Sequence, residues 1–255
     1  MHTEVVTILS LGFFLGLKHA LDADHLVAIT TMVSDGKGIL QSSIIGALWG
    51  FGHTLALVIV GSFVIALGVQ IPENVALLLE LGVAAMLIIL GVHVLIKLFR
   101  GDTLHVHTHA HHGRTHIHPH THPHTAEHSH DKGASHHESV PGNLLQRILS
   151  HVSAGKRSIL IGIVHGMAGS AALMLVVLAT ISSTNLAIAY IAVFGVGSIG
   201  GMMLMSTAIG LPFMLSAARS RIFNIVVRGI AGVVSVAFGL FLGWHIGFVE
   251  GLFLP

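Results

Sequence analysis

The sequence predicts an all-α integral membrane protein with six transmembrane helices, and three observations support this fold class. Hydrophobic residues make up 53% of the 255 residues and charged residues only 9%, which argues against an ordinary soluble domain. Apolar segments long enough to cross a hydrocarbon core of about 30 Å recur along the chain. Cysteine is absent, so the fold has no disulfide framework, and a metal site cannot use thiolate ligands.

The six expected spans follow from these apolar segments. They cover residues 5–31, 41–69, 74–98, 158–181, 186–210 and 224–250. We do not expect the first span to be a cleaved signal peptide, because polar residues interrupt it and no small-residue cleavage site follows a basic start. The expected organisation is a first three-helix unit at 1–98, a cytoplasmic loop at 99–157 and a second three-helix unit at 158–255.

The two three-helix units resemble each other in sequence. GLKHALDADHLV at 16–27 aligns without gaps with GIVHGMAGSAAL at 162–173, and ALWGFGHT at 47–54 aligns with AVFGVGSI at 192–199. A repeated unit with an odd number of spans takes opposite orientations in the membrane. We therefore expect two inverted repeats, an arrangement in which transporters place a site at the repeat interface near mid-membrane. Chance similarity between glycine-rich membrane helices is the competing explanation.

The distribution of basic residues predicts the orientation. Apart from Lys18 in the first span, Lys and Arg lie in or beside the odd-numbered loops, whereas both termini and the turns at 72–74 and 183–185 contain none. The positive-inside rule places the odd-numbered loops in the cytoplasm and both termini outside. We expect a multi-pass protein of the cytoplasmic (inner) membrane.

The third loop contains a histidine-rich segment. Residues 101–143 hold 14 histidines among Thr, Pro, Ala and Gly, with few bulky apolar residues to form a core. We expect this segment to be disordered without metal and to bind metal for buffering or delivery, although a solvated linker is the simpler interpretation. The apolar residues of 144–152 then have helical spacing, which indicates a short amphipathic helix at the cytoplasmic interface.

The first span contains the polar cluster HALDADH at His19–His25, preceded by Lys18. Each charged residue of this kind costs roughly 2.5–3.5 kcal/mol at a bilayer centre, so it needs partners or a water-filled path. On a continuous helix, His19, Asp22 and His25 share one face, and Asp24 points elsewhere. Asp24 either joins them through a distorted helix or orients a histidine of another helix. Lys18, one turn before Asp22, is expected to form a salt bridge with it while the site is empty.

Two more histidines are candidate ligands: His53 in GFGHT and His165 in HGMAGS. Imidazole and carboxylate ligands suit Ni(II), Co(II), Zn(II) or Cu(II). Structural hydrogen bonds between helices are the alternative explanation. The expected metal ligands are His19, Asp22, Asp24, His25, His53 and His165. Lys18, Ser170 and Ser198 are expected along the pathway, and Met1 with His2 is a further candidate chelate. Glu80 is attributed to snorkelling near the outer face and His93 to an interfacial position.

With these motifs, the chain resembles the nickel/cobalt transporter family, in particular its shorter urease-accessory-type permeases. His19, Asp24 and His25 match the HX4DH signature of that family, and weaker similarity extends over all six spans but not over the histidine-rich loop. The resemblance implies uptake more than export. Related nickel and cobalt efflux proteins also carry a histidine loop, but their first-helix motif typically has Pro and Gly in place of the acidic pair.

We therefore expect a secondary transporter, not an enzyme, that moves Ni(II) or Co(II) inward through the first-helix site without a cofactor. The expected partners are the divalent metal ion, the lipid bilayer and cytoplasmic nickel chaperones, and no nucleic acid. Efflux is the alternative direction. An intramembrane protease using Ser170 and His245, or a membrane metal store built on the loop, is the alternative class. The sequence does not decide between nickel and cobalt, the coupling ion or the oligomeric state.

Overall fold

The computed structural model describes residues 2–34, 38–67, 72–100, 105–111, 114–120, 144–168, 181 and 183–253. Its helices are α1 (His2–His19), α2 (Ala23–Val33), α3 (Ile39–Leu67), α4 (Glu73–Phe99), α5 (Leu144–Met167), α7 (Thr184–Arg219), α8 (Arg221–Trp244) and the π-helical turn η2 (His245–Val249). Two strands, β1 (His105–His111) and β2 (Arg114–His120), form an antiparallel hairpin. The transmembrane part is therefore helical, as expected.

Within the described residues, four helical segments are long and apolar enough to cross a membrane: Ile39–Val64, Glu73–Phe99, Thr184–Ala217 and Arg221–Val249. A fifth candidate span combines α1 and α2, which meet at a bend of 57°. The fourth expected span, at 158–181, begins within α5, and most of the remainder lies outside the described residues. The amphipathic helix expected at 144–152 is the first part of α5 and not a separate element.

Within the loop expected to lack structure, residues 105–111 and 114–120 form two paired antiparallel strands, so the expectation of disorder is wrong for these residues. Histidine recurs at every second position in HVHTHAH and in the THIHPH part of RTHIHPH, a pattern with the two-residue period of a β-strand. The register places His105 opposite His120, His107 opposite His118 and His109 opposite His116. Residues 121–143 lie outside the described residues.

The first expected span is broken where its polar residues lie. α1 ends at His19 and α2 begins at Ala23, and the intervening turn is held by hydrogen bonds from the amides of Leu21 and Asp22 to carbonyls of α1. Asp22 occupies the N-cap position of α2. Carboxylates at a helix start interact favourably with the positive end of the helix dipole. The break therefore gives both acidic residues of HALDADH a favourable position.

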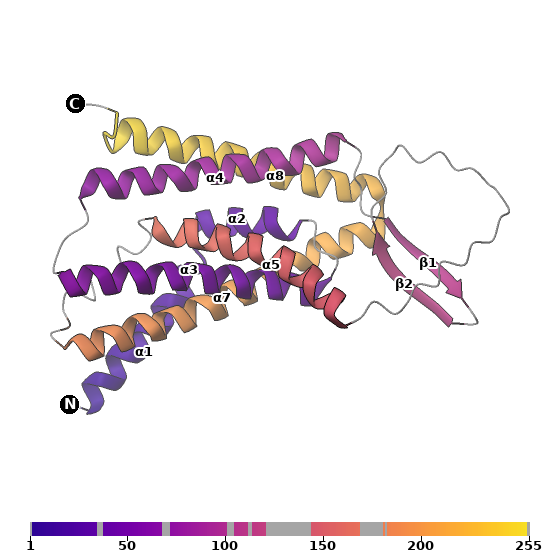
Figure 1. Cartoon of the computed structure of the whole chain (residues 1–255). Coiled ribbons are helices and arrows are strands. Elements are labelled where there is room, and N and C mark those ends of the chain that lie inside the picture. The colour runs from indigo at the N-terminus through magenta and orange to yellow at the C-terminus, as the bar shows by residue number, and fades with distance from the viewer. Residues whose placement is uncertain are drawn as a thin grey trace.

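The helices form two groups with α2 between them (Figure 1). In the larger group α3 packs along α5 and α7, and α1 packs along α7. In the smaller group α4 packs along α8. Since α2 contacts α4, α7 and α8, it bridges the seam between the two groups. Side chains on α2 are therefore placed at the boundary between two packed units.

Two glycines produce equivalent close approaches between helices. A Cβ atom on Gly16 of α1 would contact the carbonyl oxygen of Phe194 on α7, and a Cβ atom on Gly162 of α5 would contact the carbonyl oxygen of Trp49 on α3. The sequence alignment pairs Gly16 with Gly162 and Trp49 with Phe194. Small residues allow such backbone contact between membrane helices. The α1–α7 and α5–α3 contacts are thus equivalent in both sequence and packing.

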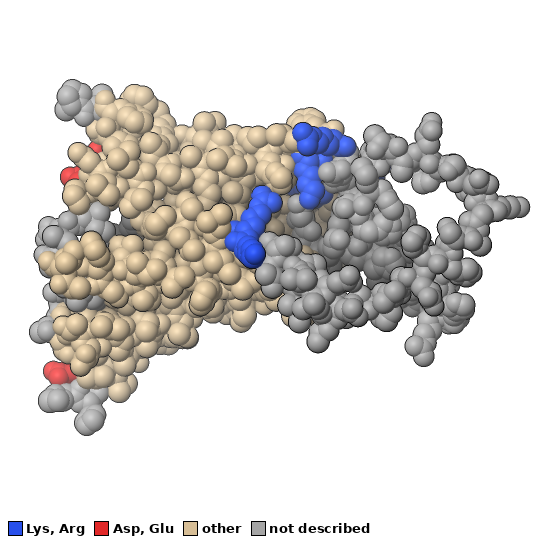
Figure 2. All heavy atoms as spheres, in the orientation of Figure 1, with Lys and Arg blue, Asp and Glu red and all other residues tan. Residues whose placement is uncertain are grey.

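The two ends of the bundle differ in charge. Lys and Arg gather at the end that carries the hairpin, and Asp and Glu appear at the opposite end (Figure 2). The N- and C-terminal ends of the chain both lie at this acidic end (Figure 1). We refer below to the basic end and the acidic end of the bundle.

Candidate metal centre

Four histidines from four different helices meet at the break in the first span. They are His19 of α1, His25 of α2, His53 of α3 and His165 of α5. The ring centroids of His25 and His165 are 4.4 Å apart, those of His19 and His25 are 4.6 Å apart, and those of His53 and His165 are 5.9 Å apart. None of the four is more than 7% exposed. The four imidazoles therefore form a compact cluster that is shielded from the surroundings.

The donor atoms fall into two groups that share His25. The candidate ligand atoms of His19, His25 and His53 lie within 4.8 Å of one another, and so do those of Asp24, His25 and His165. Metal–nitrogen bonds to imidazole are about 2.0–2.1 Å long, as in zinc sites, so two ligands of one ion cannot lie more than roughly 4 Å apart. Modest side-chain movements would bring either group into a coordinating arrangement.

The two aspartates orient two of the histidines. His19 Nδ1 lies 2.7 Å from Asp22 Oδ2, and His165 Nε2 lies 2.8 Å from Asp24 Oδ2. When these two nitrogens carry the proton and donate hydrogen bonds to the carboxylates, the other nitrogen of each neutral ring, His19 Nε2 or His165 Nδ1, carries the lone pair. His19 Nε2 is 3.1 Å from His53 Nε2, inside the cluster. Carboxylate–histidine pairs of this kind commonly fix the tautomer and orientation of metal ligands.

Hydrogen bonds use only some of the ring nitrogens of the cluster. Among the described residues, both ring nitrogens of His25 and the Nδ1 atoms of His53 and His165 are buried without a hydrogen-bond partner. Leaving a buried polar atom unpaired costs about 1–3 kcal/mol, so a cluster that served only to join helices would satisfy these nitrogens. A cation would use the lone pairs that the cluster leaves unpaired.

Aromatic rings and charge complete the surroundings of the cluster. The ring of Trp49 lies 5.2 Å from that of His25 and 5.5 Å from that of His165, and Phe194 lies 5.5 Å from His19. These rings exclude water from the imidazoles. The carboxylates of Asp22 and Asp24 lie beside these imidazoles, and carboxylate oxygen and imidazole nitrogen are both ligand atoms for divalent metal cations.

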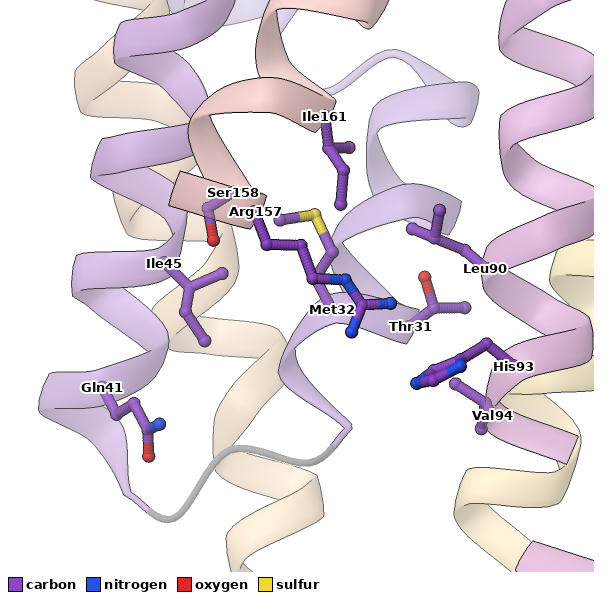
Figure 3. Close-up of a pocket in the computed structure, with 10 residues that line it drawn as sticks. All are labelled: Thr31, Met32, Gln41, Ile45, Leu90, His93, Val94, Arg157, Ser158 and Ile161. Atoms are coloured by element: carbon purple, nitrogen blue, oxygen red, sulfur yellow. The ribbon is translucent and has the colours of Figure 1, made fainter. Parts of the chain in front are cut away.

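Two cavities lie along the seam at different levels of α2. One of about 250 Å³ lies beside the start of α2 and is lined by Ala23, Asp24, Glu80, Val83, Ala168, Phe238 and Leu242. The other, of about 210 Å³, lies toward the end of α2 and is shown in Figure 3. There His93 of α4 and Arg157 of α5 extend into the space beside Thr31 and Met32 of α2. Since Asp24 lines the first cavity and Thr31 the second, His25 is placed between them along the helix.

The structure places five of the six expected metal ligands, all except Asp22, in the two groups of candidate donor atoms, and Asp22 is bonded to His19. The break in the first span turns Asp24 toward His165. The expected salt bridge of Lys18 is wrong. Lys18 is exposed and forms no ion pair with Asp22, whose carboxylate is bonded to His19 instead. Ser198 is fully buried on α7.

The remaining expected residues are not part of the described cluster. Ser170 and Met1 lie outside the described residues. The length of α1 separates the backbone of His2 from that of His19 by roughly 25 Å at 1.5 Å per residue, so an N-terminal chelate would be a separate site.

Sequence reasoning assigned no role at the centre to Trp49 or Phe194, and it placed Glu80 near the outer face. The alignment of Trp49 with Phe194 in the two units was a usable signal for the aromatic pair. For Glu80, which lines a cavity with Asp24, the sequence offers only an ionisable residue inside a span.

A protein family and a known protein match this sequence over nearly its whole length. The model of the NicO family, described as "High-affinity nickel-transport protein", matches residues 5–249. The urease accessory protein UreH of Bacillus sp. (strain TB-90) is 34% identical over 98% of this chain and 96% of its own length. The chloroplast protein FOR GROWTH AND FERTILITY 2 of Arabidopsis thaliana is 42% identical over 62 residues, which are 24% of this chain and 16% of that protein. No solved structure matches the chain.

Proposed function

Because the chain belongs to the NicO family of high-affinity nickel-transport proteins, we propose that it carries Ni(II) across the membrane through the four-histidine cluster. The observation that carries this proposal is the convergence of His19, His25, His53 and His165 from four helices, with unpaired ring nitrogens, at a helix break. Transporters typically bind their substrates at such discontinuous helices near mid-membrane. The family and the site together favour a transporter over a protease or a metal store.

The two overlapping donor groups support a stepwise transfer of the ion. His25 belongs to both groups, so an ion can stay bound to it while the other ligands exchange. In this mechanism the ion loses water to Asp24, His25 and His165 at one stage and is held by His19, His25 and His53 at the next. Imidazole suits Ni(II) and also Co(II), so cobalt is a second candidate substrate.

We propose that the direction is uptake, with the basic end of the bundle in the cytoplasm. The supporting observation is the separation of Lys and Arg from Asp and Glu along the bundle (Figure 2), combined with the positive-inside rule. A membrane potential that is negative inside favours this direction by about 2.3 kcal/mol per charge per 100 mV, or about 4.6 kcal/mol for a divalent ion. Efflux is the competing direction, in which the histidine-rich loop would collect metal.

We propose two inverted three-helix units, 1–98 and 158–255, as the underlying architecture. The equivalent contacts of Gly16 with α7 and Gly162 with α3 support this arrangement. We also propose that the histidine-rich loop buffers metal at the basic end, because the hairpin register sets three pairs of histidines opposite each other. Imidazole is the commonest protein ligand for transition metals.

Uptake of radioactive nickel and cobalt into cells that express the full chain tests the proposal. We expect His25→Ala to reduce nickel uptake at least about tenfold, since it removes the ligand common to both groups. His245→Ala is the matched control, because this histidine is partly exposed and lies outside the cluster. Wild-type uptake by His25→Ala, at equal amounts of protein in the membrane, would refute the proposed site.

A further inference from the structure

Glu80 is an intramembrane carboxylate that the cluster does not use. It lies on the third turn of α4, is partly buried and faces the 250 Å³ cavity beside the start of α2. Among the described residues it has no hydrogen-bond or ion-pair partner, whereas Glu250 is paired with His245 at 3.2 Å. Ionisable residues inside membrane spans are rare and usually face a partner or a permeation path.

The second carboxylate of this cavity is Asp24, and the other lining residues are apolar. Glu80 and Asp24 line the same cavity, so both carboxylates border one space. Like charges in a partly apolar cavity repel each other unless a cation lies between them. A concave site lined by one sign of charge also concentrates counter-ions from the solvent.

The cavity adjoins donor atoms that lack partners. Asp24 is bonded to His165, and the candidate ligand atoms of Asp24, His25 and His165 lie within 4.8 Å of one another. His25 is 1% and His165 0% exposed, and both have ring nitrogens without a hydrogen-bond partner. Asp24, which lines the cavity, thus contacts the buried imidazole of His165 and has a candidate ligand atom within 4.8 Å of one on His25.

We propose that Glu80 and Asp24 form an outer binding station for a hydrated divalent cation, from which the ion passes to His25 and His165. A water molecule occupies about 30 Å³ in the liquid, so a cavity of 250 Å³ has room for an ion with several of its waters. Carboxylates bind such an ion before imidazoles replace its waters. This inference rests on the proposed function and adds Glu80 to the transport path.

The test is the dependence of radioactive Ni(II) uptake on nickel concentration in proteoliposomes containing the full chain. We expect Glu80→Gln to raise KM about tenfold and to leave the maximal rate within about twofold, since it weakens capture of the ion. Glu80→Asp keeps the charge and should stay within about threefold of the wild-type KM. Glu73→Gln is the matched control, because Glu73 lies on the same helix, is exposed and does not line the cavity.

Equilibrium binding of Ni(II) to the detergent-purified variants separates capture from binding at the cluster. We expect Glu80→Gln to keep the nickel–imidazole absorption of the wild-type protein. The inference is overturned if Glu80→Gln has the same KM as Glu73→Gln, or if it lowers only the maximal rate, as a proton-transfer role would predict. If the Glu80 prediction fails but His25→Ala abolishes uptake, the proposed histidine site is retained and only the Glu80–Asp24 station is rejected. If His25→Ala transports normally, the proposed function itself fails.

Discussion

Replacing Gly166 with alanine tests whether the spacing of α3 and α5 determines metal binding. Gly166 follows His165 in α5, and a Cβ atom there would contact the carbonyl oxygen of His53 and lie 2.9 Å from the Cα atom of His53. Ordinary van der Waals contacts of a Cβ atom lie at 3.4–4 Å. Because the helices are closely packed, the new methyl group must push them apart by about 0.5–1 Å.

The displacement acts directly on two candidate ligands, because His53 and His165 are carried by these two backbones. Metal–ligand distances tolerate deviations of about 0.2 Å, and a misplacement of about 1 Å at a reacting centre can cost about 100-fold. We therefore expect Gly166→Ala to weaken Ni(II) binding about 100-fold, which corresponds to about 2.7 kcal/mol. Uptake at low nickel concentration should fall in parallel.

The assay is equilibrium dialysis of radioactive nickel against the detergent-purified full chain. Gly200→Ala on α7 is the matched control, since no atom other than its local helix neighbours lies within 4 Å of a Cβ at this position. Overpacking also costs about 1–3 kcal/mol of stability, so size-exclusion profiles must show that both variants remain folded. A folded Gly166→Ala variant with wild-type affinity would refute the reasoning.

Three further predictions follow from the contacts of the cluster. Asp22→Asn should weaken Ni(II) binding about 10–100-fold in the same dialysis, because it removes the carboxylate that orients His19; unchanged affinity would mean that packing alone fixes that ring. Lys18→Met should leave affinity and uptake unchanged, since Lys18 is exposed and unpaired with Asp22, and a tenfold loss would show that it acts on the site. Deletion of residues 105–137 should preserve uptake and lower the number of nickel ions bound per purified chain, whereas loss of uptake would make the loop part of the transport path.

The sequence was sufficient to predict a membrane protein with several apolar helices, and the described residues contain four or five helical segments that could span a membrane. Hydropathy identifies the segments that are apolar enough to span a membrane. HALDADH stands out because placing charged residues in such a segment costs free energy. The convergence of His53 and His165 on this motif depends on helix packing, which sequence spacing does not reveal. Only the alignment of the two units indicated that His19 and His165 occupy related positions.

The break at residues 20–22 was not predictable from local pattern. No Gly or Pro interrupts the segment between His19 and Ala23, so propensity favours a continuous helix there. On a continuous helix, Asp24 lies on a different face from His19 and His25. The role of Asp24 therefore stays open when a continuous helix is assumed. In the structure the two segments meet at a bend of 57°, and Asp24 contacts His165.

For the histidine-rich hairpin, the sequence did contain a local signal, but another property was given more weight. Its composition is typical of disordered segments, and this property outweighed the two-residue alternation in HVHTHAH and RTHIHPH. For Glu80, a position near the end of a span favoured a solvated side chain, and only packing reveals the cavity that it shares with Asp24.

The position of the break has a mechanical consequence. His19 belongs to the segment before the break and His25 to the segment after it, so the separation of 4.6 Å between their ring centroids depends on the bend between the two segments. An ion bound by both rings would fix α1 and α2 relative to each other. Straightening of the bend between these helices would move the two ligands apart. We therefore expect loading to stiffen this span and unloading to free it, so that occupancy and shape change together.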